Sequence, residues 1–117
     1  MRRGEIHLVD LEPSRGSEAN KRRPAVIVSN DGANVSAERS GRGVVTVVPL
    51  TSNTAAVYPF QVLRPAAASG LDRDSKAQGE QVRSVGVERL GPRVGALTPE
   101  LVAALDGALQ RVLGRPA

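Results

Sequence analysis

A basic segment runs directly into an apolar one near the start of the chain, where Lys21, Arg22 and Arg23 precede Pro24. The residue before a proline is held in an extended conformation, so Arg23 is expected to be fixed where a surface loop meets a strand. The planar guanidinium of arginine donates paired hydrogen bonds to phosphate and keeps its proton near neutral pH. Charge alone favours a solvated basic loop, but this position favours a fixed cation that faces a phosphate group.

A second polar feature follows the most apolar stretch of the chain. Thr51 ends the segment GVVTVVPLT and is followed by Ser52 and Asn53. A threonine hydroxyl at this position can donate a hydrogen bond to an anion. Taken alone, the pattern is more typical of a strand that ends in a polar turn.

Other catalytic groups are scarce in the sequence. The chain has no cysteine and one histidine, His7, which lies in a strand-like segment without a nucleophile-elbow sequence. Asp72, Asp74 and Glu80 would supply oxygen ligands for Mg²⁺, but Arg73 and Lys76 lie between them. A solvated charged turn explains that segment better, so we expect neither a metal ion nor a cofactor.

Composition narrows the range of partners. The net charge is +4 and aromatic residues make up 2% of the 117 residues. A basic balance is compatible with a polyanionic partner, whereas so few aromatic rings argue against recognition by base stacking. The chain has neither a signal-peptide core nor an apolar run near the ~18 residues of a membrane span, so we expect a cytoplasmic protein.

The hydropathy pattern predicts a single domain over residues 1–117. Strands are expected at 3–11, with Ile6, Leu8 and Leu11 facing inward, at 24–30 with Pro24 as first residue, at 43–53 and at 57–65. The valines of 43–53 indicate a central strand that is buried on both faces. Between these strands lie a long surface loop, 12–23, and a segment, 30–42, that holds at most one irregular helical turn.

The second half of the chain contains the clearest helix. Residues 76–90 predict short strands interrupted by a turn, with Val82, Val85 and Val87 as core candidates, after a charged turn at 70–75. A helix is expected at 99–113, because Thr98 is a good N-cap and Pro99 suits the first helical position. Its apolar stripe consists of Leu101, Leu105, Ala108, Leu109 and Val112. Several strands and one terminal helix indicate an α+β domain around a curled antiparallel sheet.

Five segments of the chain resemble the MazF/PemK/Kid family of toxins in order and spacing. They read RRGEI…VDL, GSE…KRRPAVIVSN, VVPLTSN, YPFQV and RDSKAQGEQVRS, and they cover residues 2 to about 113. The most specific parts are GSE (16–18), RP (23–24), LT (50–51) and EQVRS (80–84). The resemblance implies a small SH3-like barrel of the CcdB/Kid/MazF type, closed by the C-terminal helix, and a homodimer.

The same resemblance implies a toxin of a type II toxin–antitoxin system. Such a toxin is a sequence-specific, metal-independent endoribonuclease that acts on single-stranded mRNA and leaves 2′,3′-cyclic phosphate and 5′-OH ends. It would pair with a labile MazE-like antitoxin that blocks its RNA groove. DNA would be contacted only through that antitoxin, and no membrane would be involved.

Three site residues follow from the resemblance by position. Arg23 and Thr51 match the family's catalytic pair, and Glu18 matches a glutamate near the site or in its loop. The residues expected to bind RNA are Ser17, Lys21, Arg22, Ser52, Asn53, Arg73, Gln81 and Ser84. For Ser52, Asn53, Gln81 and Ser84, ordinary turn and strand-surface polarity explains each residue equally well.

The proton carriers stay open at this stage. Some family members use an aspartate and a histidine, but this chain has Ala19 and Asn20 where that histidine falls. The aspartate of that pair has no clear counterpart, because position 75 is Ser75. Arg73 and Asp74 remain candidates.

Two rival interpretations remain. A CcdB-like toxin of the same fold poisons gyrase without enzymatic activity, yet it lacks the RP and LT positions that are present here. The other interpretation is a structural or antitoxin-binding protein that has no remaining activity.

Overall fold

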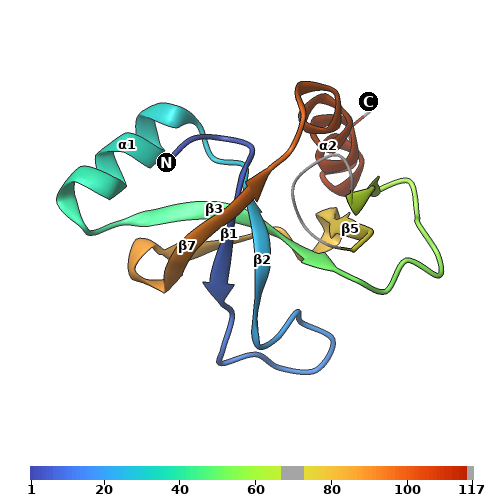
Figure 1. Cartoon of the computed structure of the whole chain (residues 1–117), viewed down its shortest axis with the longest axis horizontal. Coiled ribbons are helices and arrows are strands. Elements are labelled where there is room, and N and C mark those ends of the chain that lie inside the picture. The colour runs from blue at the N-terminus through green and yellow to red at the C-terminus, as the bar shows by residue number, and fades with distance from the viewer. Residues whose placement is uncertain (67–72, 116–117) are drawn as a thin grey trace.

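The computed structural model describes residues 1–66 and 73–115 (Figure 1). Its strands are β1 (Glu5–Asp10), β2 (Arg22–Ile27), β3 (Val44–Thr51), β4 (Gln61–Arg64), β5 (Ser75–Gln78), β6 (Arg83–Gly86) and β7 (Leu90–Ala96). Its helices are α1 (Asp31–Ser40) and α2 (Pro99–Val112), with short 3-10 turns η2 (Gly79–Gln81) and η3 (Val87–Arg89).

The strands form one antiparallel sheet in the order β4-β5-β3-β2-β1-β7, with β6 paired to β3. β3 has three partners: β2 on one edge, and β6 and then β5 along the other. The α+β class with an antiparallel sheet is therefore confirmed, and β3 is the predicted central strand. In the described part of the chain the outer strands β4 and β7 are not paired with each other, so the sheet is curled and open.

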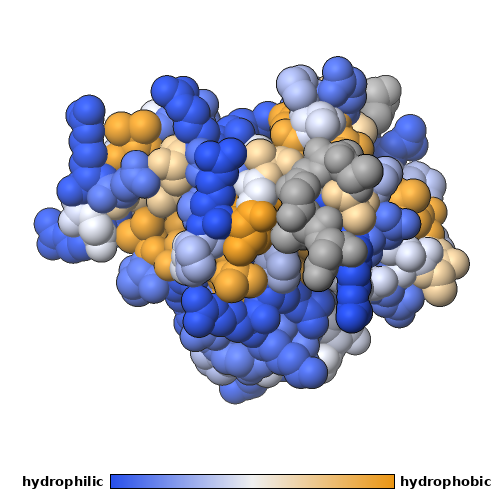
Figure 2. Space-filling view, in the orientation of Figure 1, coloured by the Kyte–Doolittle hydropathy of each residue, from blue (hydrophilic) through white to orange (hydrophobic). Residues whose placement is uncertain are grey.

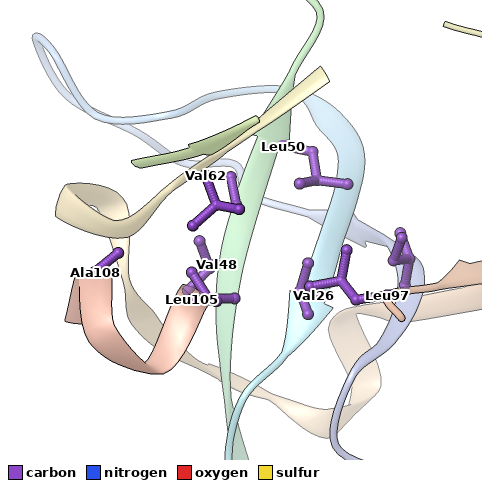
Figure 3. Packing of buried hydrophobic residues seen from close by; sticks show 9 residues of the cluster. Val26, Val48, Leu50, Val62, Leu97, Leu105 and Ala108 are labelled. Atoms are coloured by element: carbon purple, nitrogen blue, oxygen red, sulfur yellow. The ribbon is translucent and has the colours of Figure 1, made fainter. Parts of the chain in front are cut away.

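Both faces of this sheet are buried, because successive side chains of a strand point to opposite faces. On one face, Val48 and Leu50 of β3 pack in a cluster with Leu105 and Ala108 of α2 (Figure 3). On the other face, Val45 and Val47 pack in a second cluster with Ala37 of α1. Two helices thus cover the two faces of one central strand.

The first strand differs from its prediction in the face that each side chain occupies. Ile6 and Leu11 are fully buried as expected, but Ile6 belongs to the α2 cluster and Leu11 to the α1 cluster. Val9, which was not predicted to be buried, is also 0% exposed, whereas Leu8 is half-buried. The prediction assumed one buried face, and the second helix buries the other.

That second helix is itself a correction. The sequence predicted at most one irregular turn in 30–42, yet α1 has ten residues. Its ends carry the usual signals: the Asn30 side chain accepts from Ala33 N at 2.8 Å, and Gly41 ends the helix with φ 66°. Weak amphipathicity hid the helix, since only Asn34 and Ala37 are buried on it.

Other element boundaries moved by a few residues. β2 begins two residues before Pro24, because Arg22 and Arg23 extend its pairing with Asp10 and Val9 of β1. β4 begins at Gln61 and not at 57, and the predicted short strands in 76–90 are β5 and β6. Val85 is buried as predicted, and Val82 and Val87 are half-buried. β7 was not predicted at all. The turn predicted at 70–75 lies partly outside the described residues.

The C-terminal helix agrees with its prediction to within one residue. Thr98 Oγ1 accepts from Leu101 N at 3.3 Å, and Pro99 occupies the first turn. Leu105 and Ala108 are buried, and Leu101 and Leu109 pack at the margin of the cluster. No described helix has the length and apolarity that a membrane crossing requires.

Candidate active site

A pocket of about 340 Å³ opens where β2, β3 and β5 meet at one end of the sheet. It is lined by Lys21, Arg22, Arg23, Pro24, Leu50, Thr51, Ser52, Arg73, Asp74 and Ser75. These residues come from the start of β2, the end of β3 and the start of β5. Three separate parts of the chain therefore form one concave surface.

The register of β2 and β3 explains why Arg23 and Thr51 meet. Ala25 is paired with Pro49 in these antiparallel strands. The β2–β3 pairing ends at this pair, and Arg23 and Thr51 each lie two residues beyond it, at the same end of the two strands. Both line the pocket, so the fold brings the two residues of the predicted catalytic pair to one pocket.

Arg23 is held by a neighbour in the preceding loop. Its Nε donates to the Asn20 carbonyl oxygen at 2.8 Å, and its Nη2 donates to Asn20 Oδ1 at 3.0 Å. Among the described residues no oxygen accepts from Nη1. The guanidinium is thus fixed along one edge, and its remaining N–H groups are available to an anion in the pocket.

Thr51 has its hydroxyl proton available as well. Its Oγ1 accepts from Asn53 N at 3.2 Å, which uses a lone pair, and among the described residues no atom accepts from its O–H group. Ser52 also lines the pocket, whereas Asn53 is not among the lining residues. The Asn53 Oδ1 atom accepts from Ala55 N at 3.3 Å, so that amide shapes the turn after β3.

The pocket is strongly cationic. Lys21, Arg22, Arg23 and Arg73 contribute positive charge, and Asp74 is the carboxylate among the described lining residues. Lys21 has φ 64°, an unusual value for a residue with a side chain, and its N–H donates to Glu12 Oε1 at 2.7 Å. The surface over the β1–β2 loop, at the bottom of the view, is mostly hydrophilic (Figure 2). This arrangement suits a phosphodiester chain with its reacting phosphate near Arg23.

Comparison with known proteins decides the family. Residues 2–113 match the model of the PemK-like, MazF-like toxin of type II toxin–antitoxin systems. The chain belongs to this family. It is 61% identical to endoribonuclease MazF9 of Mycobacterium tuberculosis over 110 residues, which cover 94% of this chain and 93% of the relative.

Solved structures agree with the fold. MazF from Deinococcus radiodurans superposes with a TM-score of 0.78 at 24% identity, covering 97% of this chain and 96% of that one. A mycobacterial endoribonuclease solved in complex with its cognate antitoxin gives a TM-score of 0.73 at 25% identity, covering 100% and 98%. The resemblance drawn from sequence motifs is confirmed, and the gyrase-poisoning alternative is not favoured for a MazF-like chain.

Two family motif residues, Glu18 and Gln81, act on the first loop in this MazF-like structure. Glu18 Oε1 accepts from Arg15 N at 2.7 Å and closes a local turn. Gln81 Nε2 donates to the Ser17 carbonyl oxygen at 3.0 Å, and Gln81 Oε1 accepts from Ala19 N at 2.9 Å. Neither Glu18, Ser17 nor Gln81 is a lining residue of the pocket, so the structure places all three in the support of the loop.

Ser84 lies apart from the pocket. It pairs with Thr46 in β6 and β3, and the two side-chain oxygens are 3.3 Å apart. His7 is also remote from the lining residues: its ring nitrogens contact Gly91 O at 3.1 Å and Glu5 Oε1 at 3.0 Å. Within residues 1–66 and 73–115 no group of three acidic, histidine or cysteine side chains is placed to hold a metal ion.

One residue beside the pocket was missed by the sequence reasoning. Arg64 of β4 is fully buried and donates to Ser75 Oγ at 2.8 Å and to the Arg73 carbonyl oxygen at 2.7 Å. Burial lowers the pKa of its guanidinium from the ordinary value, and the nearby Asp74 charge opposes that shift. The only sequence signal was a charged residue inside the apolar segment FQVLRP.

Proposed function

We propose that this MazF-like protein is a toxin that cleaves single-stranded mRNA at specific sequences, without a metal ion, in the cytoplasm. The single observation that carries the proposal is that Arg23 and Thr51 line the same cationic pocket. Their side chains supply the donors that phosphoryl-transfer chemistry needs, and they come from the paired strands β2 and β3.

RNA carries its own nucleophile, so the protein has little covalent chemistry to perform. The 2′-OH attacks the adjacent phosphorus, the O2′–P bond forms and the P–O5′ bond breaks. A base takes the 2′-OH proton and an acid delivers a proton to the departing 5′ oxygen. The products are a 2′,3′-cyclic phosphate and a 5′-OH end.

Arg23 and Thr51 would stabilise the charge that builds on the nonbridging oxygens in the transition state. Removing one such donor typically costs about 3–4 kcal/mol of transition-state stabilisation. Asp74, the carboxylate among the described lining residues, is the candidate acceptor of the 2′-OH proton. Arginine is a poor base because its pKa lies far above neutrality, so we assign Arg23 to charge stabilisation.

Membership of the family supports two proposed protein partners. A mycobacterial relative was solved with its cognate antitoxin, and we propose a MazE-like antitoxin that covers the pocket of this chain. We also propose a homodimer. Val44, Leu63 and Leu113 are 61%, 44% and 73% exposed, and a second copy would cover apolar surface of this kind. Sedimentation that shows only monomer at micromolar concentration would contradict the dimer.

Incubation of the pure protein with a long RNA in EDTA tests the enzymatic proposal. We expect discrete fragments that end in cyclic phosphate, and we expect Arg23→Ala to abolish them. Arg42→Ala, an exposed arginine between α1 and β3, is the matched control and should cleave normally. Cleavage that survives Arg23→Ala, or that requires a divalent ion, would refute the proposed mechanism.

A further inference from the structure

Arg64 and Ser75 face each other across β4 and β5, directly beside the pocket. They are paired in register in the two antiparallel strands. The Arg64 side chain is 0% exposed and Ser75 is 6% exposed. A buried guanidinium is costly unless its donors are satisfied. Here Nε donates to Ser75 Oγ at 2.8 Å, Nη1 to the Pro65 carbonyl oxygen at 3.2 Å and Nη2 to the Arg73 carbonyl oxygen at 2.7 Å.

The hydroxyl of Ser75 has one proton left to donate. A serine hydroxyl carries one donor and two acceptor lone pairs, and Arg64 occupies a lone pair of Ser75. Among the residues that the structure describes, no atom accepts from the Ser75 proton. Because Oγ accepts from a cation, its O–H group is polarised and becomes a stronger donor.

The backbone sets this hydroxyl beside the pair already described. Ser75 lines the same pocket as Arg23 and Thr51. It precedes Lys76, which is paired with Thr51 in β5 and β3. Arg64 itself is not among the lining residues and is enclosed by its three acceptors, so it can act on a pocket ligand only through another residue.

We propose that Ser75 is an additional substrate-contacting donor, which binds a phosphate oxygen of the RNA in the pocket, and that Arg64 is the positioning residue that orients the Ser75 hydroxyl. This inference rests on the proposed function, because it takes the pocket as the RNA site. The pocket would then present donors from three strands to the phosphate: Arg23 from β2, Thr51 from β3 and Ser75 from β5.

The test compares cleavage by the wild-type protein, Ser75→Ala, Arg64→Lys and the double variant. Ser75→Ala removes one hydrogen bond to a charged group, so kcat/KM should fall about tenfold or more. Arg64→Lys keeps the positive charge but loses the planar fork that holds Ser75, and it should lower kcat/KM by a similar factor. Ser40→Ala, at the end of α1, is the matched control and should behave as wild type.

The double variant separates positioning from general structural support. If Arg64 acts through Ser75, Arg64→Lys has little further effect once Ser75 is alanine, so the two losses are not additive. All four proteins are assayed well below their unfolding temperatures. A Ser75→Ala protein with wild-type kcat/KM, or an Arg64→Lys loss that is equal in both backgrounds, would overturn the inference.

A binding measurement keeps this result distinct from failure of the proposed function. Short single-stranded DNA of random sequence lacks the 2′-OH and serves as an uncleavable phosphodiester probe at low salt. We expect Ser75→Ala to bind this probe about 3- to 10-fold more weakly. If the wild-type protein binds the probe but never cuts RNA, the nuclease proposal is refuted. The effect of Ser75→Ala on binding can still be measured in that case. Equal binding by wild type and Ser75→Ala would count against the inference itself.

Discussion

The Arg23 guanidinium is fastened to Asn20 at two points, with Nε donating to the Asn20 backbone oxygen at 2.8 Å and Nη2 donating to its side-chain oxygen at 3.0 Å. Asn20 thus fixes both the position and the plane of the Arg23 guanidinium. Asn20 lies in the loop and Arg23 in β2, so the loop conformation sets the direction in which the remaining N–H groups of Arg23 point.

This contact predicts losses of activity of different size for two substitutions of Asn20. Asn20→Ala removes the contact to Nη2 but keeps the backbone acceptor, so kcat/KM should fall about 3- to 10-fold. Asn20→Asp sets a carboxylate against the guanidinium, where it competes with the substrate phosphate, and should cause the larger loss. Initial rates of RNA cleavage measure both. Wild-type rates in Asn20→Asp would show that Arg23 does not bind the phosphate from this position.

Removal of the Thr51 hydroxyl should impair the chemical step while the fold persists. Thr51→Val keeps the shape of the side chain and removes the donor, so kcat should fall by about 10²- to 10³-fold. Thr51→Ser keeps the donor and should retain most of the activity. Thr46→Val, on the same strand but outside the pocket lining, is the matched control. Equal activity of Thr51→Val and wild type would remove Thr51 from the mechanism.

The bridge from Gln81 to the first loop predicts an effect on loop order. Gln81→Ala removes the hydrogen bonds to Ser17 and Ala19, so the loop should open more often. Trypsin should then cleave after Arg15 faster than in the wild-type protein, and KM for RNA should rise. Gln110→Ala on the exposed face of α2 is the control. Unchanged proteolysis would mean that the loop is held by other contacts.

The stability of the fold at acidic pH should depend on Glu5. Burial raises the pKa of this carboxyl, but the hydrogen bond with His7 and the charge of Arg93 outweigh it, so the pKa lies below its ordinary value. A carboxyl whose pKa is lower in the folded chain than in the unfolded chain stabilises the fold at pH above its unfolded pKa. This contribution is lost as pH falls through its folded pKa.

The unfolding temperature should therefore drop as pH falls below about 4.5, the ordinary value for this group. Glu5→Gln should flatten this part of the curve, and Arg93→Gln should flatten it less because it removes a smaller cause. Thermal unfolding followed by circular dichroism across acidic pH checks both. An unchanged profile in Glu5→Gln would contradict the assignment.

The elements that could be predicted from the sequence are those with strong local signals. The central strand β3 and the helix α2 have unambiguous patterns, a valine run in one and caps with an apolar stripe in the other. α1 buries few side chains, and β7 reads L-G-P-R-V-G-A without alternation. Tertiary contacts stabilise both, and such contacts leave little trace in local periodicity.

The site residues divide in the same way, into those with a local sequence signal and those whose role depends on tertiary contacts. Arg23, Thr51, Lys21, Arg22, Ser52 and Arg73 were predicted and line the pocket. Gln81 and Ser84 were predicted from polarity alone, and their hydrogen-bond partners became visible only in the folded chain. Arg64 and Ser75 face each other because of strand register, a relation between distant residues that no single segment encodes.

The pocket draws its walls from residues 21–24, 50–52 and 73–75, with a consequence for the timing of synthesis. A nascent chain has no complete pocket until residue 75 has been made and has emerged to pair with β4. Strand β7, which pairs with the other edge of β1, is made later still, and so is helix α2. A chain that is still being made therefore cannot use this pocket until most of its own message has been read.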